Sequence, residues 1–379
     1  MLLHFHDPSK LKTRKVLFEE AYHAHDSDTL EQLKELSSRR KALEESINGS
    51  TFISEAIARE MSGGITSRHQ QDLQKLENYL PLLENLIEHA DMNGSDPRML
   101  QWMVDLNLQW NSALSASSFF SLIGPKFFRI DNLRYELGMI LFLYGALMRE
   151  RAFEVLPDDL VQAATLFRKA AGVYNYLTHT ILPVLQPFLP PERPPEVTTS
   201  MSSIMCLICL AEAQAVTTRK AEEKASRGSL LAKLHYGVTQ LLIEAMTIID
   251  SNIGDLSNIS SQLIEFISLS SIMHESRSRR YMATELSRNG QVGLAIGILR
   301  HAVNEMNRRS PSEQSWRVVF EQEINALAEI LQKLEQENDF VWLDKIPCLD
   351  ELPFLEGKKI ASIIPYAPVR LEKELVFRI

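Results

Sequence analysis

The segment SIMCLICLAEAQAVTTRKAEEKASRGSLLAKL, Ser203 to Leu234, is the most informative part of this chain. Its apolar residues recur three or four positions apart, which places them on one face of an α-helix. They are Ile204, Ile208 and Ala211 in the first part and Leu230 and Leu234 in the second. Between the two parts, Gly228 suits a helix end and Ser229 a helix start. We therefore predict two helical segments, or one bent helix, with the leucines beginning the second.

This segment combines leucines with lysines and contains no catalytic constellation, which favours binding over chemistry. The leucines allow two interpretations. Leu230, Leu231 and Leu234 belong to an ordinary buried core, or they form an apolar patch that receives a partner.

Helical periodicity extends over most of the chain. Asp26 to Asp28 can cap a helix that continues to about Asn48, and Thr51 to Glu60 can form a short second helix. Gln70 to His89 carries a leucine every three or four residues, which predicts a buried stripe. Further helices are expected at Tyr135 to Arg151, at Leu160 to Leu185 and from Leu230 to about Asp250.

Other stretches break this pattern. From Val104 to Trp110 apolar and polar residues alternate, which predicts a β-strand. The prolines between Pro187 and Pro195 predict an extended loop. After Gln336 recurring prolines predict an extended tail packed along the helices, with a two-stranded contact to the early strand as one option. Tyr281 to Ala302 follow the order of a tetratricopeptide-like hairpin, and such pairs stack into a solenoid with a concave face.

Length and composition fit one elongated helical domain over residues 1–379. No Gly/Ser linker divides the 379 residues, and 45% hydrophobic residues suffice for a sizeable core. The formal net charge of −9 argues against nucleic acid as a partner, because such binding needs a basic surface.

The chain carries few signals for export or for the membrane. Its three cysteines do not make a disulfide framework, and no N-terminal signal pattern is present, so we expect a cytoplasmic protein. The longest apolar run, Met139 to Met148, is about half of a bilayer span, so no transmembrane segment is expected. No lipidation motif is present.

Candidate catalytic and metal-binding groups lack the partners that such chemistry needs. Cys206 and Cys209 have redox spacing but lie in an apolar helical run, so we expect core cysteines. His4 with His6, and His23 with His25, could bind a metal, yet neither pair has further ligands at suitable spacing. We therefore expect no enzyme activity, no cofactor and no metal site.

Five segments in order resemble the Bro-one (BRO) domain family, the fold of Alix, Brox and the yeast Bro protein. They are LQWNSALS at Leu108 to Ser115, YELGMILFLYGAL at Tyr135 to Leu147, ATLFRKAAGVYNYL at Ala164 to Leu177, the central segment quoted above, and ENDFVWLDKIPCLDELPFLEGKKIASIIPY at Glu337 to Tyr366. The resemblance covers about residues 100–370, and within the family the chain most resembles plant single-domain endosomal-targeting proteins.

The resemblance implies a mainly α, boomerang-like domain with a tetratricopeptide-like solenoid core, a small β element and an extended C-terminal segment. It also implies a non-catalytic adaptor on endosomes, in multivesicular body formation and protein transport. There, a concave apolar patch binds the C-terminal amphipathic helix of an ESCRT-III subunit. Leu230 and Leu234 fall on two apolar contact positions of the family and Lys220 on its basic one, with Leu231 beside them. Thr217 stands where animal members usually carry a large aromatic residue, which weakens the patch.

Two alternative functions remain at this point. A helical scaffold could bind a different peptide, as Thr217 allows. A peripheral membrane protein could use basic groups, which are Arg277, Arg279 and Arg280 in one cluster and Lys10, Lys12, Arg14 and Lys15 in another.

Overall fold

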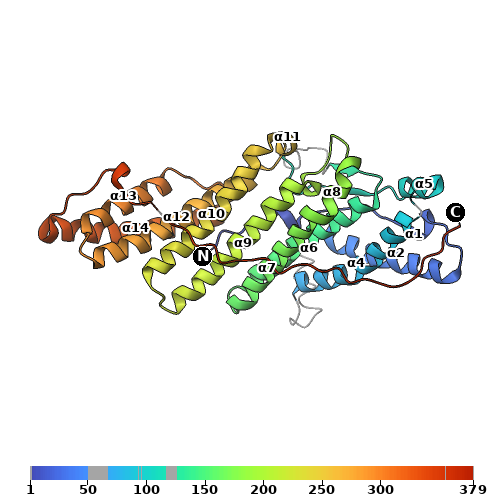
Figure 1. Ribbon diagram of the computed structural model, residues 1–379, viewed down its shortest axis with the longest axis horizontal. Helices are drawn as coiled ribbons and strands as arrows, with labels where there is room; N and C mark the ends of the chain where they lie inside the picture. The colour runs from blue at the N-terminus through green and yellow to red at the C-terminus, as the bar shows by residue number, and fades with distance from the viewer. Residues whose placement is uncertain are drawn as a thin grey trace.

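The computed structural model describes residues 2–49, 67–92, 94, 96–116, 126–354 and 356–378. Figure 1 shows an elongated array of helices with the C-terminus at one end and the N-terminus near the middle. The end near the C-terminus is formed by α1 (Phe18–Ala21), α2 (Ser27–Asn48) and α5 (Pro97–Asp105), and the far end by α13 (Val292–Asn307) and α14 (Gln314–Glu337). Between them lie α4 (Arg68–Met92), α6 (Leu133–Val155), α7 (Leu160–Tyr176), α8 (Leu182–Leu185), α9 (Thr199–Glu223), α10 (Gly228–Ser251), α11 (Ile253–Leu256) and α12 (Ser261–Arg288). The mainly α, elongated fold is confirmed.

The long helices pack on one another in a row from α4 through α6, α7, α9, α10 and α12 to α13 and α14. The predicted helical hairpin is present: α12 and α13 are joined by a tight turn in which Gly290 has a φ of +78°. Only glycine adopts this backbone conformation without strain, which explains the residue at that turn. The result is the predicted solenoid-like stack.

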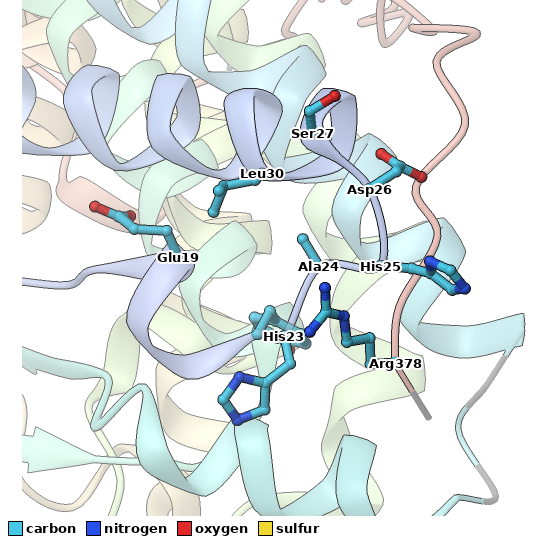
Figure 2. Close-up of a pocket in the computed structure, with 9 residues that line it drawn as sticks. Glu19, His23, Ala24, His25, Asp26, Ser27, Leu30 and Arg378 are labelled. Atoms are coloured by element: carbon cyan, nitrogen blue, oxygen red, sulfur yellow. The ribbon is translucent and has the colours of Figure 1, made fainter.

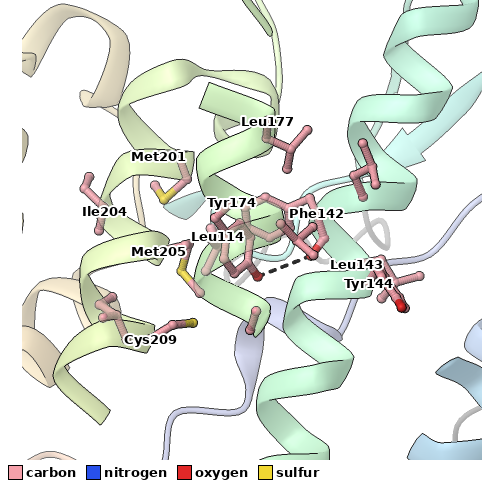
Figure 3. Close-up of a cluster of buried hydrophobic side chains, with 14 of the residues drawn as sticks. Leu114, Phe142, Leu143, Tyr144, Tyr174, Leu177, Met201, Ile204, Met205 and Cys209 are labelled. Carbon is pink, nitrogen blue, oxygen red and sulfur yellow. Dashed lines mark hydrogen bonds between the residues drawn. The ribbon is translucent and has the colours of Figure 1, made fainter. Parts of the chain in front are cut away.

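The core centres on α6, α7 and α9 (Figure 3). Residues Met139 to Leu143 of α6 are fully buried, because helices pack on several sides of α6. The Tyr174 hydroxyl of α7 donates a hydrogen bond to the carbonyl oxygen of Phe142 at 3.2 Å, the dashed line in Figure 3. The predicted leucine stripe on α4, from Leu73 to Leu86, is also buried.

The break between the two central helices lies where the sequence predicted it, within one turn. Helix α9 ends at Glu223 and α10 begins at Gly228. Ala225 adopts a left-handed φ of 51°, and the amide of Ser226 donates to the carbonyl oxygen of Ala221 at 3.1 Å. The chain reverses here, so α9 and α10 form an antiparallel pair.

The strand predicted from Val104 to Trp110 was wrong over most of its length. Asp96 caps α5, and Met99, Trp102 and Leu106 face the core at helical spacing. Strand β1 is Gln109–Asn111 and pairs antiparallel with β2, Phe127–Arg129, so the early strand does not pair with the C-terminal tail. The loop between Pro187 and Pro195 is confirmed apart from short 3₁₀ turns at its two ends. The helix predicted at Thr51 to Glu60 lies outside the described residues.

The last part of the chain forms an extended segment that we call the C-terminal strap, residues 344–354 and 356–378. Figure 1 shows it running along the array from the α13 end to the α1 end. It approaches three helices at glycines: a β-carbon at Gly172 would lie 1.8 Å from the carbonyl oxygen of Ile364. At Gly237 and Gly293 the corresponding distance to a strap carbonyl oxygen would be 2.4 Å. The predicted extended tail is therefore confirmed. Its backbone lies so close to the helices that these three positions have no room for a side chain.

Among the described residues, one helix has the length and composition of a membrane span. Helix α9 is long and apolar enough by length and composition, but 72% of its most apolar window is buried inside the protein. A central helix of a helical array has the same composition, so this finding is weak evidence for a span.

Candidate partner-binding surface

The strap crosses the α9–α10 pair at one glutamine. The side-chain nitrogen of Gln214 in α9 donates to the carbonyl oxygens of Leu234 in α10, at 2.8 Å, and of Lys358 in the strap, at 3.0 Å. Its side-chain oxygen accepts from the amide of Ile360 at 2.9 Å. One buried side chain therefore joins two helices and the strap.

The hydrogen bonds of Gln214 show which turns of α9 and α10 lie side by side, and so where the predicted contact residues lie relative to the strap. Because α9 and α10 run antiparallel, Thr217, one turn after Gln214, lies level with the residues one turn before Leu234. Those residues are Leu230 and Leu231. Four of the five predicted contact positions therefore lie within one turn of the point where the strap crosses.

The structure divides the predicted residues by exposure. Leu230 is 38% exposed, Thr217 is exposed and Lys220 is half-buried, so these three can reach a partner. Leu231 and Leu234 are each only 4% exposed. A partner helix could contact Leu234 only after a local rearrangement, so Leu230 is the accessible apolar residue of the set.

Lysines surround this surface. Lys233 of α10 pairs with Glu356 of the strap, and the amide of Lys358 donates to the carbonyl oxygen of Lys233 at 2.9 Å. Lys220 and Lys224 have no carboxylate within ion-pair distance among the described residues. Both can therefore meet acidic groups of a partner. We call the surface formed by Thr217, Lys220, Lys224 and Leu230 the hairpin patch.

The arginine cluster does not form an open basic surface. Arg277 is buried and donates to Glu323 of α14 at 2.8 Å, and Arg280 forms an ion pair with the same carboxylate at 3.1 Å. Arg279 pairs with Glu275 one turn earlier on α12. Two carboxylates, Glu275 and Glu323, therefore offset part of the charge of the three arginines, and their membrane-facing role stays a prediction. Lys10, Lys12, Arg14 and Lys15 are exposed.

The two central cysteines are core residues, as predicted. Burial raises the pKa of Cys206 to about 12 and raises that of Cys209 well above its ordinary value. Both thiols therefore stay protonated at neutral pH, and the nucleophilic thiolate is absent.

A hollow of about 590 Å³ lies between α1, α2 and the end of the strap, lined among others by His23, His25 and Arg378. In Figure 2 the two histidine rings point in different directions, and Asp26 lies at the start of α2. The Asp26 carboxylate accepts the amide of Thr29 at 2.7 Å as a helix cap. The His23 and His25 rings therefore do not converge on one metal position.

The fold and the hairpin patch define an elongated helical-repeat protein with a strap across its central helices. A family model described as BRO1-like domain matches residues 15–377, and the chain belongs to this family. The match begins much nearer the N-terminus than the resemblance seen in the sequence. The likeness to plant members stays a prediction.

Known proteins of this kind resemble the chain at low identity. The pH-response regulator palA/RIM20 of Emericella nidulans is 27% identical over 235 residues, 60% of this chain and 27% of that protein. Human BRO1 domain-containing protein BROX is 21% identical over 307 residues, 77% of this chain and 72% of BROX. The BRO1 domain of ALIX, solved as a complex with CHMP4C, matches with a TM-score of 0.71 at 19% identity, covering 96% of each chain. The chain thus matches about a quarter of the length of the fungal regulator.

Proposed function

We propose that this protein is a non-catalytic adaptor that binds the C-terminal amphipathic helix of an ESCRT-III subunit in endosomal sorting. Membership of the BRO1-like domain family supports the class. The ALIX domain that shares this fold was solved with CHMP4C, which is an ESCRT-III subunit. The observation that carries the proposal is the exposure of Leu230, an apolar residue of the hairpin patch that the sequence resemblance aligns with a family contact position.

The chemistry of the hairpin patch fits an amphipathic helix with an acidic flank. Such a helix buries apolar residues at i, i+3, i+4 and i+7 in a groove. Leu230 supplies an apolar contact, and Lys220 and Lys224 supply positive charge without carboxylate partners among the described residues. Opposite charges at the rim raise the association rate and select the partner. The protein would act in the cytoplasm, on the endosome surface, recruited by this partner.

A titration tests the proposal. Fluorescently labelled C-terminal helices of several ESCRT-III subunits are titrated with the purified protein, alongside a peptide of the same composition in scrambled order. We expect saturable binding in the micromolar range for one natural helix and none for the scrambled peptide. The absence of binding to every natural helix at several hundred micromolar would overturn the proposal. It would favour a scaffold for a different peptide.

A further inference from the structure

The N-terminal segment carries a second pair of alternating histidines, which does converge. Residues 2–6 form no regular helix or strand, but their burial alternates along the segment. Leu3 and Phe5 face inward and are each 2% exposed, whereas His4 and His6 share the other side. The two imidazole rings lie together, with their centroids 3.5 Å apart.

A buried carboxylate of α6 occupies that place. One oxygen of Glu150 lies 3.0 Å from His4 Nε2 and 3.0 Å from His6 Nδ1. All three ligand atoms lie within 4.8 Å of one another. The ligand atoms of a tetrahedral zinc ion lie about 3.3 Å apart, because zinc bonds to nitrogen and oxygen are about 2.0 to 2.1 Å long. The cluster needs only small movements to accept such an ion.

The surroundings hold the three groups in position. Trp316 of α14 donates its ring N–H to the carbonyl oxygen of His4 at 2.9 Å, and Phe153 stacks on the His4 ring with centroids 3.8 Å apart. Arg149 also donates to the carbonyl oxygen of Phe5. Rigid support of this kind is what a metal site needs around its ligands.

The nearest positive charge is already paired. Arg149 lies 3.7 Å from the other oxygen of Glu150, but its guanidinium donates to Glu212 of α9 at 2.6 to 3.0 Å. The Glu150 carboxylate therefore keeps negative charge for a cation. The side chain of His6 is 56% exposed, which leaves an open path for the ion.

We propose that His4, His6 and Glu150 form a binding site for a divalent transition-metal ion, zinc in the first place. Two imidazoles and one carboxylate are ligands that zinc takes in proteins, and a water molecule would complete the tetrahedron. The ion would tie the N-terminal segment to α6, because its ligands come from both. It would therefore stabilise the folded protein.

The test uses untagged, full-length protein, since a histidine tag would itself bind the metal. Zinc affinity is measured by competition with a coloured indicator, and cobalt is added separately to record the absorption bands of tetrahedral coordination. We expect one zinc ion per chain, a higher melting temperature with zinc, and tetrahedral cobalt bands. His6→Ala should weaken zinc binding at least tenfold and remove the cobalt bands.

His25→Ala is the matched control, because His25 belongs to the histidine pair that does not converge. It should bind zinc like the wild type. If Glu150→Gln folds, it should also bind zinc more weakly than the wild type. If it does not fold, His6→Ala still tests the proposal, because His6 is exposed and its replacement should leave the fold intact. Equal zinc binding by the wild type and His6→Ala would overturn the proposal and leave the cluster as a hydrogen-bonded contact between two histidines and a carboxylate.

Discussion

Gln214 and Lys358 are joined by a hydrogen bond of 3.0 Å across 144 residues of sequence. This bond fixes the C-terminal strap to α9 beside the exposed Leu230 of α10. The strap is therefore part of the surface on which the proposed partner would bind. Its loss should change both stability and recognition.

Replacement of Gln214 by methionine removes the bonds to Leu234, Lys358 and Ile360 while keeping the side-chain volume. We expect a loss of about 2 kcal/mol or more in the free energy of unfolding, because buried backbone groups lose their partners. Chemical denaturation measures the loss, and hydrogen exchange should show a faster-exchanging Ile360 amide. Gln291→Met is the control, since the Gln291 side chain makes no capping hydrogen bond. Equal stability of both variants would refute the role of Gln214.

A methyl group at Gly172 should displace the strap. Its β-carbon would meet the carbonyl oxygen of Ile364 at 1.8 Å, so Gly172→Ala cannot keep the observed backbone contact. We expect destabilisation of about 1 to 3 kcal/mol and faster proteolysis near Ile364. Gly254→Ala should show neither effect, because among the described residues no atom beyond its own chain neighbours and helix backbone lies within 4 Å of the added carbon. An intact strap in Gly172→Ala would show that this contact is not required.

An aromatic residue at position 217 should strengthen the proposed interaction. Full burial of such a side chain contributes roughly 1.5 to 3 kcal/mol, so Thr217→Phe is expected to raise the affinity for the ESCRT-III helix about tenfold to a hundredfold. Thr247→Phe on α10 is the control, since both threonines are exposed and bond the carbonyl oxygen four residues earlier. An unchanged affinity of Thr217→Phe would place the partner elsewhere.

The contribution of the buried histidines His235 and His274 to stability should fall as the pH decreases from 7 to 5. Burial lowers the pKa of His274 well below its ordinary value, and it lowers that of His235 despite the hydrogen bond with Glu222. Below about pH 6.5 the unfolded chain therefore binds protons that the folded chain does not, which favours unfolding by up to about 1.4 kcal/mol per pH unit for each histidine. The two histidines should therefore lower the melting temperature over this range, whereas the raised pKa values of Glu84 and His69 act in the opposite direction.

His274→Asn isolates this effect, because the asparagine amide can replace ring Nδ1 towards His235. The variant should lose less melting temperature between pH 7 and pH 5 than the wild type. His179→Asn, at an exposed residue, should follow the wild type. Glu222 does not affect this pH range. Burial raises its pKa, but hydrogen bonds from His235 and Tyr281 lower it further, to about 2. The stability that Glu222 contributes is therefore lost only at lower pH. Equal pH dependence in all three proteins would contradict the assignment.

Much of the fold was predictable from local patterns. The leucines of α4 and the Asp26 cap of α2 are short-range signals, and the structure confirms both. The strand error near Val104 arose because alternation and helical spacing overlap in that stretch. Asp96 followed by Pro97 is a helix-start signal that would have decided the case.

The surface was harder to predict because it depends on contacts far apart in sequence. The helical spacing of Leu230 and Leu234 places both on one face, but it cannot say that one is exposed and the other is buried beside the strap. Glu150 could not be matched to His4 and His6 for the same reason. Glycines inside helices, such as Gly172, were an unused signal, since they lower helix propensity and mark the close approach of another backbone.

We propose that the hairpin patch binds an ESCRT-III helix. This proposal is tested most directly by titrating the same labelled helix with the wild type, Leu230→Asp and Ile243→Asp. Both leucine and isoleucine are exposed on α10, but they lie about 20 Å apart along the helix and on different faces. We expect micromolar binding by the wild type and by Ile243→Asp, and at least tenfold weaker binding by Leu230→Asp. Equal binding by both variants would contradict the proposed binding surface.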